Sequence, residues 1–316
     1  MAYKAPGKHY RAGLSLVDVM GLFPDDAAAE AWIAGVRWPN GPTCPHCDSD
    51  NVQTGAAHKM PYRCRKCRKR FSVRTGTVMA DSKLGYQVWA LASYLMTTEL
   101  KGRSSMKLHR DLGVTQKTAW HLAHRIRETW DTLPIRFEGP VEVDETYIGG
   151  RERNKHAHKK ANLGRGPVGK TAVVGAKDRA TNEVSAEVID HTDAVTLQGF
   201  VSDHTAEGAK IYTDDALAYR GLPNHETVRH SVSEYVNGKA HTNGVESFWA
   251  MLKRGYQGVY HQMSPKHLQR YVNEFAGRHN IRELNTIDQM RLIVAGLVGK
   301  RLQYEELVAG RRGWAT

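Results

Sequence analysis

The chain has 316 residues, a formal net charge of +12 and charged side chains at 25% of its positions. No apolar run approaches the roughly 18 residues that a membrane-spanning helix requires. The N-terminal stretch also lacks the apolar centre of a signal peptide, so we expect a cytoplasmic protein with no membrane partner. The excess of Lys and Arg favours a polyanionic partner, because cations that displace counterions from phosphates gain free energy.

The positive charge is uneven along the chain. Residues 59–74 hold eight Lys or Arg and no acidic residue, and residues 151–170 hold seven against one acidic residue. A membrane-surface protein would more usually carry its charge on a basic amphipathic helix. We therefore expect nucleic acid as the partner, rather than an acidic protein or a membrane surface.

The first motif contains every cysteine of the chain, in two C-x2-C pairs that sixteen residues separate. This spacing is typical of a zinc ribbon, in which two tight turns present four thiolates to one structural zinc ion. Two disulfides are the alternative, and they would need an oxidising compartment. The predicted zinc ligands are Cys44, Cys47, Cys64 and Cys67, with His46 and His58 as bystanders because four thiolates complete the shell.

Basic side chains lie between and after the second pair of ligands, in "RCRKCRKR". A folded ribbon would present this charge to phosphate, whereas the alternative is a solvated basic loop. The predicted DNA-binding residues of the ribbon are Arg65, Lys66, Arg68 and Lys69.

Residues 83–131 show helical periodicity, with one apolar segment at "YQVWALASYLMTTEL" and two more after it. In the later pair, Ser104 or Ser105 can cap one helix, Gly113 can end it and Thr115 can cap the next. This layout predicts a DNA-binding helix-turn-helix, with an ordinary helical hairpin as the alternative. The second helix has the apolar residues Ala119, Leu122, Ala123, Ile126 and Trp130 on one face, and Gln116, Lys117, His121 and His124 on the other. The first three of these polar residues are predicted to contact DNA.

The pattern changes to strands from residue 141. The runs "VEVDETYI", "TAVVGAKD", "EVSAEVID" and "AKIYTDD" are bounded by Gly, Asp or Asn, and a helix is expected at 193–203 before the last of them. A further helix is expected in "HTNGVESFWAMLKRGY". Strands and helices in this order predict a mixed α/β fold.

Three separated carboxylates stand out in this half. Asp144 is expected at the end of the first strand, Asp214 at the end of the fourth, and Glu246 on the shoulder of the last helix. Carboxylates that converge can hold two hard divalent cations, which activate the attacking oxygen and stabilise the leaving one in phosphoryl transfer. Each acid alone is more often a cap or a turn residue, and the pattern does not choose between Asp214 and its neighbour Asp215.

The motifs, taken in order, resemble those of the zinc-ribbon DDE transposases of bacterial insertion sequences, of the ISXO2-like type. The similarity runs from about residue 20 to about residue 285. It is carried by "RWPNGPTCPHC", "YRCRKCRKRFSVRTGTVM", "VEVDETYIGG", "GRGPVGKTAVVGAKDR", "IYTDDALAY" and "HTNGVESFWAMLKRGYQGVYH".

The resemblance implies a ribonuclease H-like catalytic domain in which three acidic residues bind Mg2+ or Mn2+, cut DNA and join the freed 3' end to a target. Motif register assigns these roles to Asp144 in "VDETYIGG", to Asp214 in "TDxxxxY" and to Glu246 in "HTNxxExFW". Asn243, one turn before Glu246, could orient that carboxylate or the DNA, and Lys253 could meet a phosphate. Both could equally be plain surface residues.

The expected organisation is an α/β protein with five parts. These are an N-terminal helical segment (1–40), the zinc ribbon (41–78), the helix-turn-helix region (83–133), the ribonuclease H-like domain (138–285) and a C-terminal helical segment (286–316). The expected partner is double-stranded DNA, at the element ends and at the target, for a nucleoid-associated protein. Action at two ends implies a homo-oligomer. A nuclease without strand transfer and a non-enzymatic DNA-binding regulator are the alternative functions.

Two further segments complete the pattern. "GRGPVGKT" (164–171) matches a nucleotide-binding P-loop in form, but a strand-like "TAVVGA" follows where a helix would be required, so we expect no nucleotide and a basic loop that touches DNA. "PKHLQRYVNEFAGRHN" and "TIDQMRLIVAGLVGKRLQYEELV" predict two amphipathic helices that pack on the catalytic core, with a dimer contact as the alternative.

Overall fold

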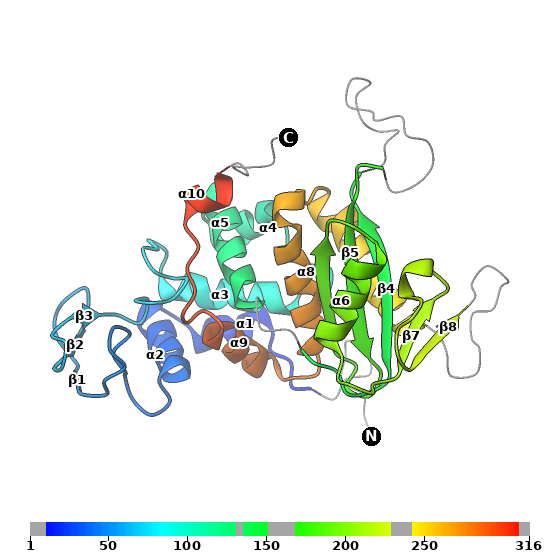
Figure 1. Cartoon of the computed structure of the whole chain (residues 1–316). Coiled ribbons are helices and arrows are strands. Elements are labelled where there is room, and N and C mark those ends of the chain that lie inside the picture. The colour runs from blue at the N-terminus through cyan, green and yellow to red at the C-terminus, as the bar shows by residue number, and fades with distance from the viewer. Residues whose placement is uncertain (1–10, 131–134, 151–167, 229–241, 310–316) are drawn as a thin grey trace. The chain divides into compact units, whose positions relative to one another are not determined.

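The computed structural model describes residues 11–130, 135–150, 168–228 and 242–309 (Figure 1). The chain divides into two compact units. The first consists of Met1–Glu99, Arg103–Asp131 and Arg282–Thr316, and the second of Leu100–Gly102 and Thr132–Ile281. No helix in these described ranges is both long enough and apolar enough to cross a membrane.

The first unit packs a small sheet and a set of helices around one core, in which α3 contacts α1, α2, α4, α5 and α9. The N-terminal elements are α1 (Leu16–Leu22) and α2 (Asp26–Arg37). The antiparallel sheet has the order β1 (Val52–Gln53), β2 (Tyr62–Cys64) and β3 (Arg70–Phe71). After the sheet come α3 (Tyr86–Thr98), α4 (Ser105–Leu112), α5 (Gln116–Arg127) and a 3-10 turn (Glu128–Trp130). The C-terminal region adds α9 (Thr286–Ala295) and α10 (Tyr304–Val308) to this unit.

The junction between α4 and α5 follows the predicted caps. Ser104 rather than Ser105 caps α4 and accepts a hydrogen bond from the backbone N–H of Lys107. Gly113 ends that helix at a φ of +63°, a left-handed conformation in which glycine has no steric penalty. Thr115 caps α5. The predicted apolar face is buried except for Trp130, which is partly buried. His124 was placed on the polar face and is in fact completely buried, because the core closes over that side of α5 as well.

The C-terminal helices differ from their prediction. The first matches α8 of the second unit, but the second is split into α9 and α10 by residues 296–303. Met290, Ile293 and Val294 join the core of the first unit, where α9 contacts α2 and α3. The expectation that this helix packs on the catalytic core was therefore wrong.

The second unit is a five-stranded sheet with helices on both faces (Figure 1). Its strands are β4 (Val141–Ile148), β5 (Thr171–Asp178), β6 (Val184–Ile189), β7 (Ile211–Asp214) and β8 (His225–Val228). Its helices are α6 (Ala194–His204), a 3-10 turn (Leu217–Tyr219), α7 (Asn243–Gly255), a π-helical turn (Tyr256–Tyr260) and α8 (Pro265–Asn280). One face of the sheet packs on α6, and the other packs on α7 and α8.

The strand order is β6-β5-β4-β7-β8. β4, β5 and β6 pair antiparallel, whereas β4, β7 and β8 pair parallel. The predicted strands and the helix before β7 are confirmed, but the short edge strand β8 was not predicted. β5 begins at Thr171, so a strand and not a helix follows the P-loop-like sequence. Most of the basic loop before it, residues 151–167, lies outside the described residues.

Candidate functional site

The alternation of β4 separates its apolar and acidic side chains onto two faces. Val141 and Val143 lie in the core beneath α6, so Glu142 and Asp144 point to the opposite face, which α7 covers. Asp144 is the fourth residue of an eight-residue strand, and the prediction that it ends the strand was wrong. The parallel pairing of β4 with β7 extends only to Glu142 and Tyr212, so no strand is paired with β4 on that side at Asp144.

Asp214 lies on the same face of the sheet as Asp144. It is the last residue of β7 and follows Tyr212 by two positions, and Tyr212 is paired with Glu142 in the parallel register. Its Oδ1 accepts a hydrogen bond from the backbone N–H of Ala216, 3.1 Å away, in a turn that ends the strand. Asp215 lies beyond the strand and is exposed.

An indole from α7 contacts Asp144 directly. The Nε1–H of Trp249 donates to Oδ2 of Asp144 at 3.0 Å. The residue opposite Asp144 on β5 is Gly175, and a Cβ there would lie 2.6 Å from Cη2 of Trp249. Glycine at this position therefore leaves the space in which the indole lies across the sheet and reaches the carboxylate.

The electrostatic environment makes Asp144 reluctant to ionise. Burial raises its pKa to about 7, and the nearby carboxylates of Glu145, Asp214 and Glu246 contribute in the same direction. Glu145 points to the other face, where the hydroxyl of Tyr219 donates to its Oε2 at 2.8 Å. Burial raises the pKa of Glu145 as well. A positive charge on the α7 face would offset this concentration of negative charge.

Glu142 fixes the start of α7. Its side chain is almost completely buried, and its two oxygens accept hydrogen bonds from Nε of Arg179 at 2.8 Å and from the backbone N–H of Val245 at 3.0 Å. The guanidinium of Arg179 also lies over the ring of Tyr212, 4.0 Å from its centroid. Glu142 is thus a buried anchor that connects β4 to Arg179, directly after β5, and to the start of α7.

Glu246 lies one turn into α7, where the Thr242 hydroxyl donates to its Oε1 at 2.9 Å. Its side chain is exposed, as are those of Asn243 and Lys253. Within the described ranges, the four cysteines are the only group of three or more His, Cys, Asp or Glu side chains gathered to hold an ion. Asp144 and Asp214 therefore share a face of the sheet and Glu246 lies on the helix that covers it, but the three carboxylates do not close into such a group.

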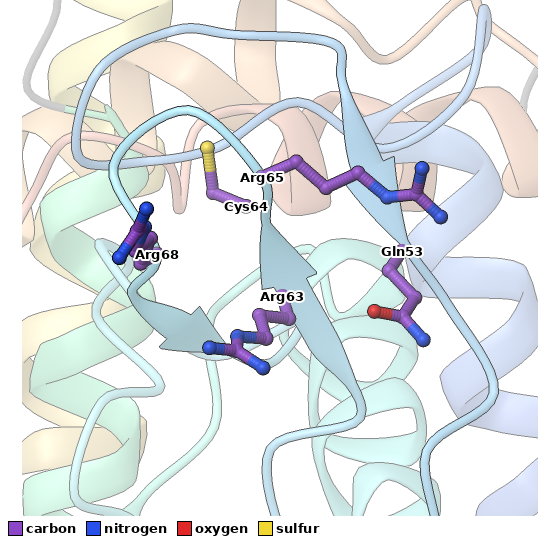
Figure 2. Close-up of a pocket in the computed structure, with 5 residues that line it drawn as sticks. All are labelled: Gln53, Arg63, Cys64, Arg65 and Arg68. Atoms are coloured by element: carbon purple, nitrogen blue, oxygen red, sulfur yellow. The ribbon is translucent and has the colours of Figure 1, made fainter.

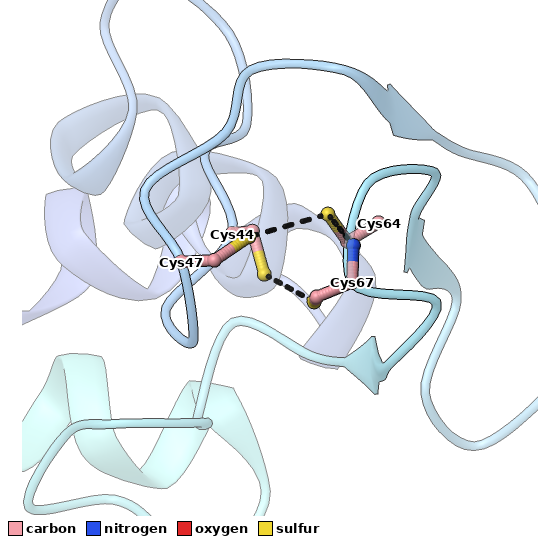
Figure 3. A group of neighbouring side chains, drawn as sticks. All are labelled: Cys44, Cys47, Cys64 and Cys67. Atoms are coloured by element: carbon pink, nitrogen blue, oxygen red, sulfur yellow. Dashed lines mark hydrogen bonds between the residues drawn. The ribbon is translucent and has the colours of Figure 1, made fainter.

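The four cysteines do form a closed group (Figure 3). The Sγ atoms of Cys44 and Cys67 are 3.6 Å apart, as are those of Cys47 and Cys64. Four sulfurs at about 2.3 Å from a tetrahedral zinc ion would be separated by about 3.8 Å. A hydrogen bond from the backbone N–H of Cys67 lowers the pKa of the Cys64 thiol, whereas burial raises the pKa of the Cys44 thiol, and a bound zinc ion would hold both as thiolates. The cluster fits a structural zinc ion, with His46 and His58 outside it.

The basic residues predicted to bind DNA in the ribbon, Arg65, Lys66, Arg68 and Lys69, are all exposed. Beside them lies an open hollow of about 210 Å3, lined by Gln53, Arg63, Cys64, Arg65 and Arg68 (Figure 2). The sequence analysis did not single out Gln53 and Arg63, because strands of two and three residues are too short to reveal which side chains share a face.

The polar face of α5 is only partly open. Gln116 is exposed, and its Nε2 donates to Ser105 Oγ at 2.9 Å. The ammonium of Lys117 lies 4.3 Å from the ring centroid of Tyr304 in α10. His121 is half-buried, with Nε2 3.2 Å from the Leu302 carbonyl oxygen and its ring against Tyr304. The open surface on which the prediction for His121 rested is therefore occupied by residues 302–304.

Comparison with known proteins places these features in a family. Residues 136–280 match the model of the ISXO2-like transposase domain, and residues 24–70 match that of a transposase zinc-ribbon domain. An uncharacterised protein in transposable element ISH50 of Halobacterium salinarum is 30% identical over 275 residues, which cover 82% of this chain and 92% of that protein. The chain belongs to the ISXO2-like transposase family.

The chain is accordingly a DNA transposase. The transposase domain spans β4 to α8 and includes all three predicted catalytic carboxylates, and the zinc-ribbon domain includes all four cysteines. The crystal structure of a pre-cleavage Mos1 transpososome is also similar, with 12% identity over 91% of this chain and 98% of that chain. Its TM-score of 0.23 is too low to establish a shared fold.

Proposed function

We propose that this transposase cleaves and joins DNA with two Mg2+ or Mn2+ ions held by Asp144, Asp214 and Glu246. The observation that carries the proposal is the placement of Asp144 and Asp214 on one face of the parallel pair β4 and β7, with Glu246 on the helix that covers this face. Asp144 has a raised pKa in this environment, as expected for a carboxyl group whose ionised form needs a cation.

A ribonuclease H-like architecture for this unit is part of the proposal. It is supported by a sheet in which three antiparallel strands precede two parallel ones, in the order β6-β5-β4-β7-β8, and by helices on both faces. In such a site the bound ions would activate the attacking oxygen and stabilise the leaving one. The chain itself positions the ligands: Glu142 anchors the first turn of α7, and Trp249 holds the carboxylate of Asp144.

The first unit is proposed to bind the element ends. The ribbon presents exposed Arg and Lys side chains, and the capped helices α4 and α5 with the left-handed Gly113 between them favour a helix-turn-helix. Gln116 and Lys117 lie at the N-terminus of α5, which is the part of a recognition helix that reaches base edges. Contact through His121 would require residues 302–304 to move away. We further propose that two or more copies act together, because two ends must be processed.

The test uses the purified full-length chain, DNA that carries the ends of its own element, and Mg2+. Asp144→Asn, Asp214→Asn and Glu246→Gln should each lower cleavage at least about 1,000-fold, while binding of end DNA stays within a few-fold of the unchanged protein. Asp215→Asn is the matched control, since it neutralises the adjacent exposed carboxylate and should still cleave.

Sequencing of the products separates joining from simple cutting. Products in which a 3' end is joined to a second duplex support the transposase activity proposed for this site. Full activity of Asp144→Asn, or loss of activity in Asp215→Asn with retention in Asp214→Asn, would contradict the assigned ligands.

A further inference from the structure

The small sheet of the zinc ribbon has one face that is fixed in the core. Tyr62 and Phe71 are opposite each other in register and stack with their ring centroids 5.4 Å apart. Trp38, directly after α2, packs edge-on against both rings, at 5.2 Å and 5.9 Å. Because successive residues of a strand point to opposite faces, this aromatic packing forces the neighbouring side chains outward.

The outward face carries like charges side by side. Arg63 of β2 is directly opposite Gln53 of β1 on one side and directly opposite Arg70 of β3 on the other, and all three side chains are exposed. Like charges at directly opposite positions destabilise an antiparallel pair. In the described part of the chain, neither Arg63 nor Arg70 makes an ion pair or a side-chain hydrogen bond that would offset this repulsion.

Two further guanidinium groups adjoin this row. Arg65 and Arg68, from the turn after β2, line the same hollow as Arg63 and Gln53 (Figure 2). Arg68 has a φ of +61°, a left-handed conformation that a non-glycine residue rarely adopts, in the tight turn that also carries Cys67. A bound zinc ion would fix this turn and so hold these two arginines beside the sheet.

The geometry points to a phosphate-binding surface on the outward face of the β1-β2-β3 sheet, formed by Arg63 and Arg70 together with Arg65 and Arg68, that takes the backbone of duplex DNA. The inference rests on the proposed function, and it goes further by assigning the sheet face, not only the second cysteine turn, to the contact. Guanidinium groups pair with phosphate oxygens through two parallel hydrogen bonds. A phosphate bound by both Arg63 and Arg70 would therefore offset the repulsion between their positive charges. Phosphate contacts position DNA without reading its sequence, so this surface should bind end and random duplexes alike.

The experiment measures binding of the full-length, zinc-loaded protein to fluorescent duplexes in buffer without Mg2+, over a range of salt concentrations. One duplex carries the element end and the other has a shuffled sequence. Loss of two phosphate contacts in the Arg63→Gln/Arg70→Gln variant should reduce the slope of log K against log salt by about 1.8 and weaken binding at least about 10-fold at 0.1 M salt, by similar factors for both duplexes.

Two variants provide controls. Arg291→Gln/Arg301→Gln removes the same charge from the same unit, but from arginines that are paired with Asp288 and Asp81, and it should change the slope little. Arg63→Lys/Arg70→Lys keeps both charges and should keep the slope. The zinc content of each variant shows whether the ribbon is still folded, so that a loss of DNA binding is not confused with unfolding. Because the two arginines repel each other, the Gln variant should retain the same amount of zinc as the unchanged protein. If the double Gln variant loses zinc, the same measurement is made on Arg63→Gln and Arg70→Gln separately, and each should show half of the change in slope.

The outcomes distinguish this surface from the proposed function. If the unchanged protein binds and cleaves end DNA while the Gln variant keeps its affinity and slope, the phosphate-binding surface is refuted and the catalytic proposal stands. A loss confined to the end duplex would mean that these arginines read bases, which also contradicts the inference. If the unchanged protein binds neither duplex, both proposals fail.

Discussion

Replacement of Asp144 by Asn should abolish catalysis and yet stabilise the protein in the absence of Mg2+. Asn has the same shape and can still accept the hydrogen bond from Trp249 Nε1, but it carries no charge. The folded-state pKa of Asp144 is about 7, raised from 3.8 by burial and by nearby carboxylates. Above pH 3.8 the unfolded chain releases this proton while the folded chain retains it, so stability falls as the pH rises towards 7.

The magnitude follows from linkage. The pKa of Asp144 differs by about 3 units between the folded and unfolded states. Above pH 7 this difference lowers the free energy of unfolding by about 4 kcal/mol, whereas at pH 5 it lowers it by only about 1.5 kcal/mol. These are upper limits, because relaxation around the charge reduces them. The Asp144→Asn variant should therefore unfold at a higher temperature than the unchanged protein, and its advantage should grow from pH 5 to pH 8.

Thermal unfolding at both pH values measures this difference. The buffer should contain neither Mg2+ nor a chelator, so that the ribbon keeps its zinc. A gain of about 2.5 kcal/mol between the two pH values would correspond to at least about 5 °C for a unit of this size. Asp215→Asn is the control and should shift the midpoint by less than about 0.5 kcal/mol, because its side chain is exposed. If the Asp144→Asn variant is no more stable at pH 8 than the unchanged protein, the assignment of Asp144 as a partly buried carboxyl group with a raised pKa is refuted.

Two further substitutions probe the contacts between α7 and β4. Trp249→Phe removes the N–H that donates to Asp144, a bond worth about 1.5–3 kcal/mol to a charged acceptor, so cleavage should need about 10-fold more Mg2+. Trp89→Phe is the control: it removes an indole hydrogen bond to the neutral hydroxyl of Ser82 in the first unit and should leave the Mg2+ requirement unchanged. Equal Mg2+ requirements in the two variants would count against a role for Trp249. Glu142→Gln breaks the pair with Arg179 and should lower the free energy of unfolding in urea by about 3 kcal/mol, whereas Glu187→Gln, at a half-exposed position, should cost less than about 1 kcal/mol. A small effect at Glu142 would show that the start of α7 is held by other contacts.

The sequence determined those features that depend on neighbours a few positions away. The C-x2-C spacing located the four thiolates. Ser104 or Ser105, Gly113 and Thr115 marked helix ends, because helix caps act on backbone groups within three or four residues, and the structure then selected Ser104. The main strands of the second unit were predicted for the same reason, since their apolar content and bounding turn residues are local. The edge strand β8, with only four residues and no such signal, was missed.

The tertiary structure decided everything that depends on register between distant segments. Only the pairing of β4 with β7 puts Asp144 and Asp214 on one face and leaves Asp215 beyond the strand. Only packing shows that His124 is buried and that residues 302–304 lie against His121. The pairing of β2 with β3 likewise brings Arg63 opposite Arg70. The sequence of a single strand or helix specifies which of its side chains share a face. The segment that packs against this face comes from elsewhere in the chain, and a shift of one residue in strand pairing would turn the opposite set of side chains towards it.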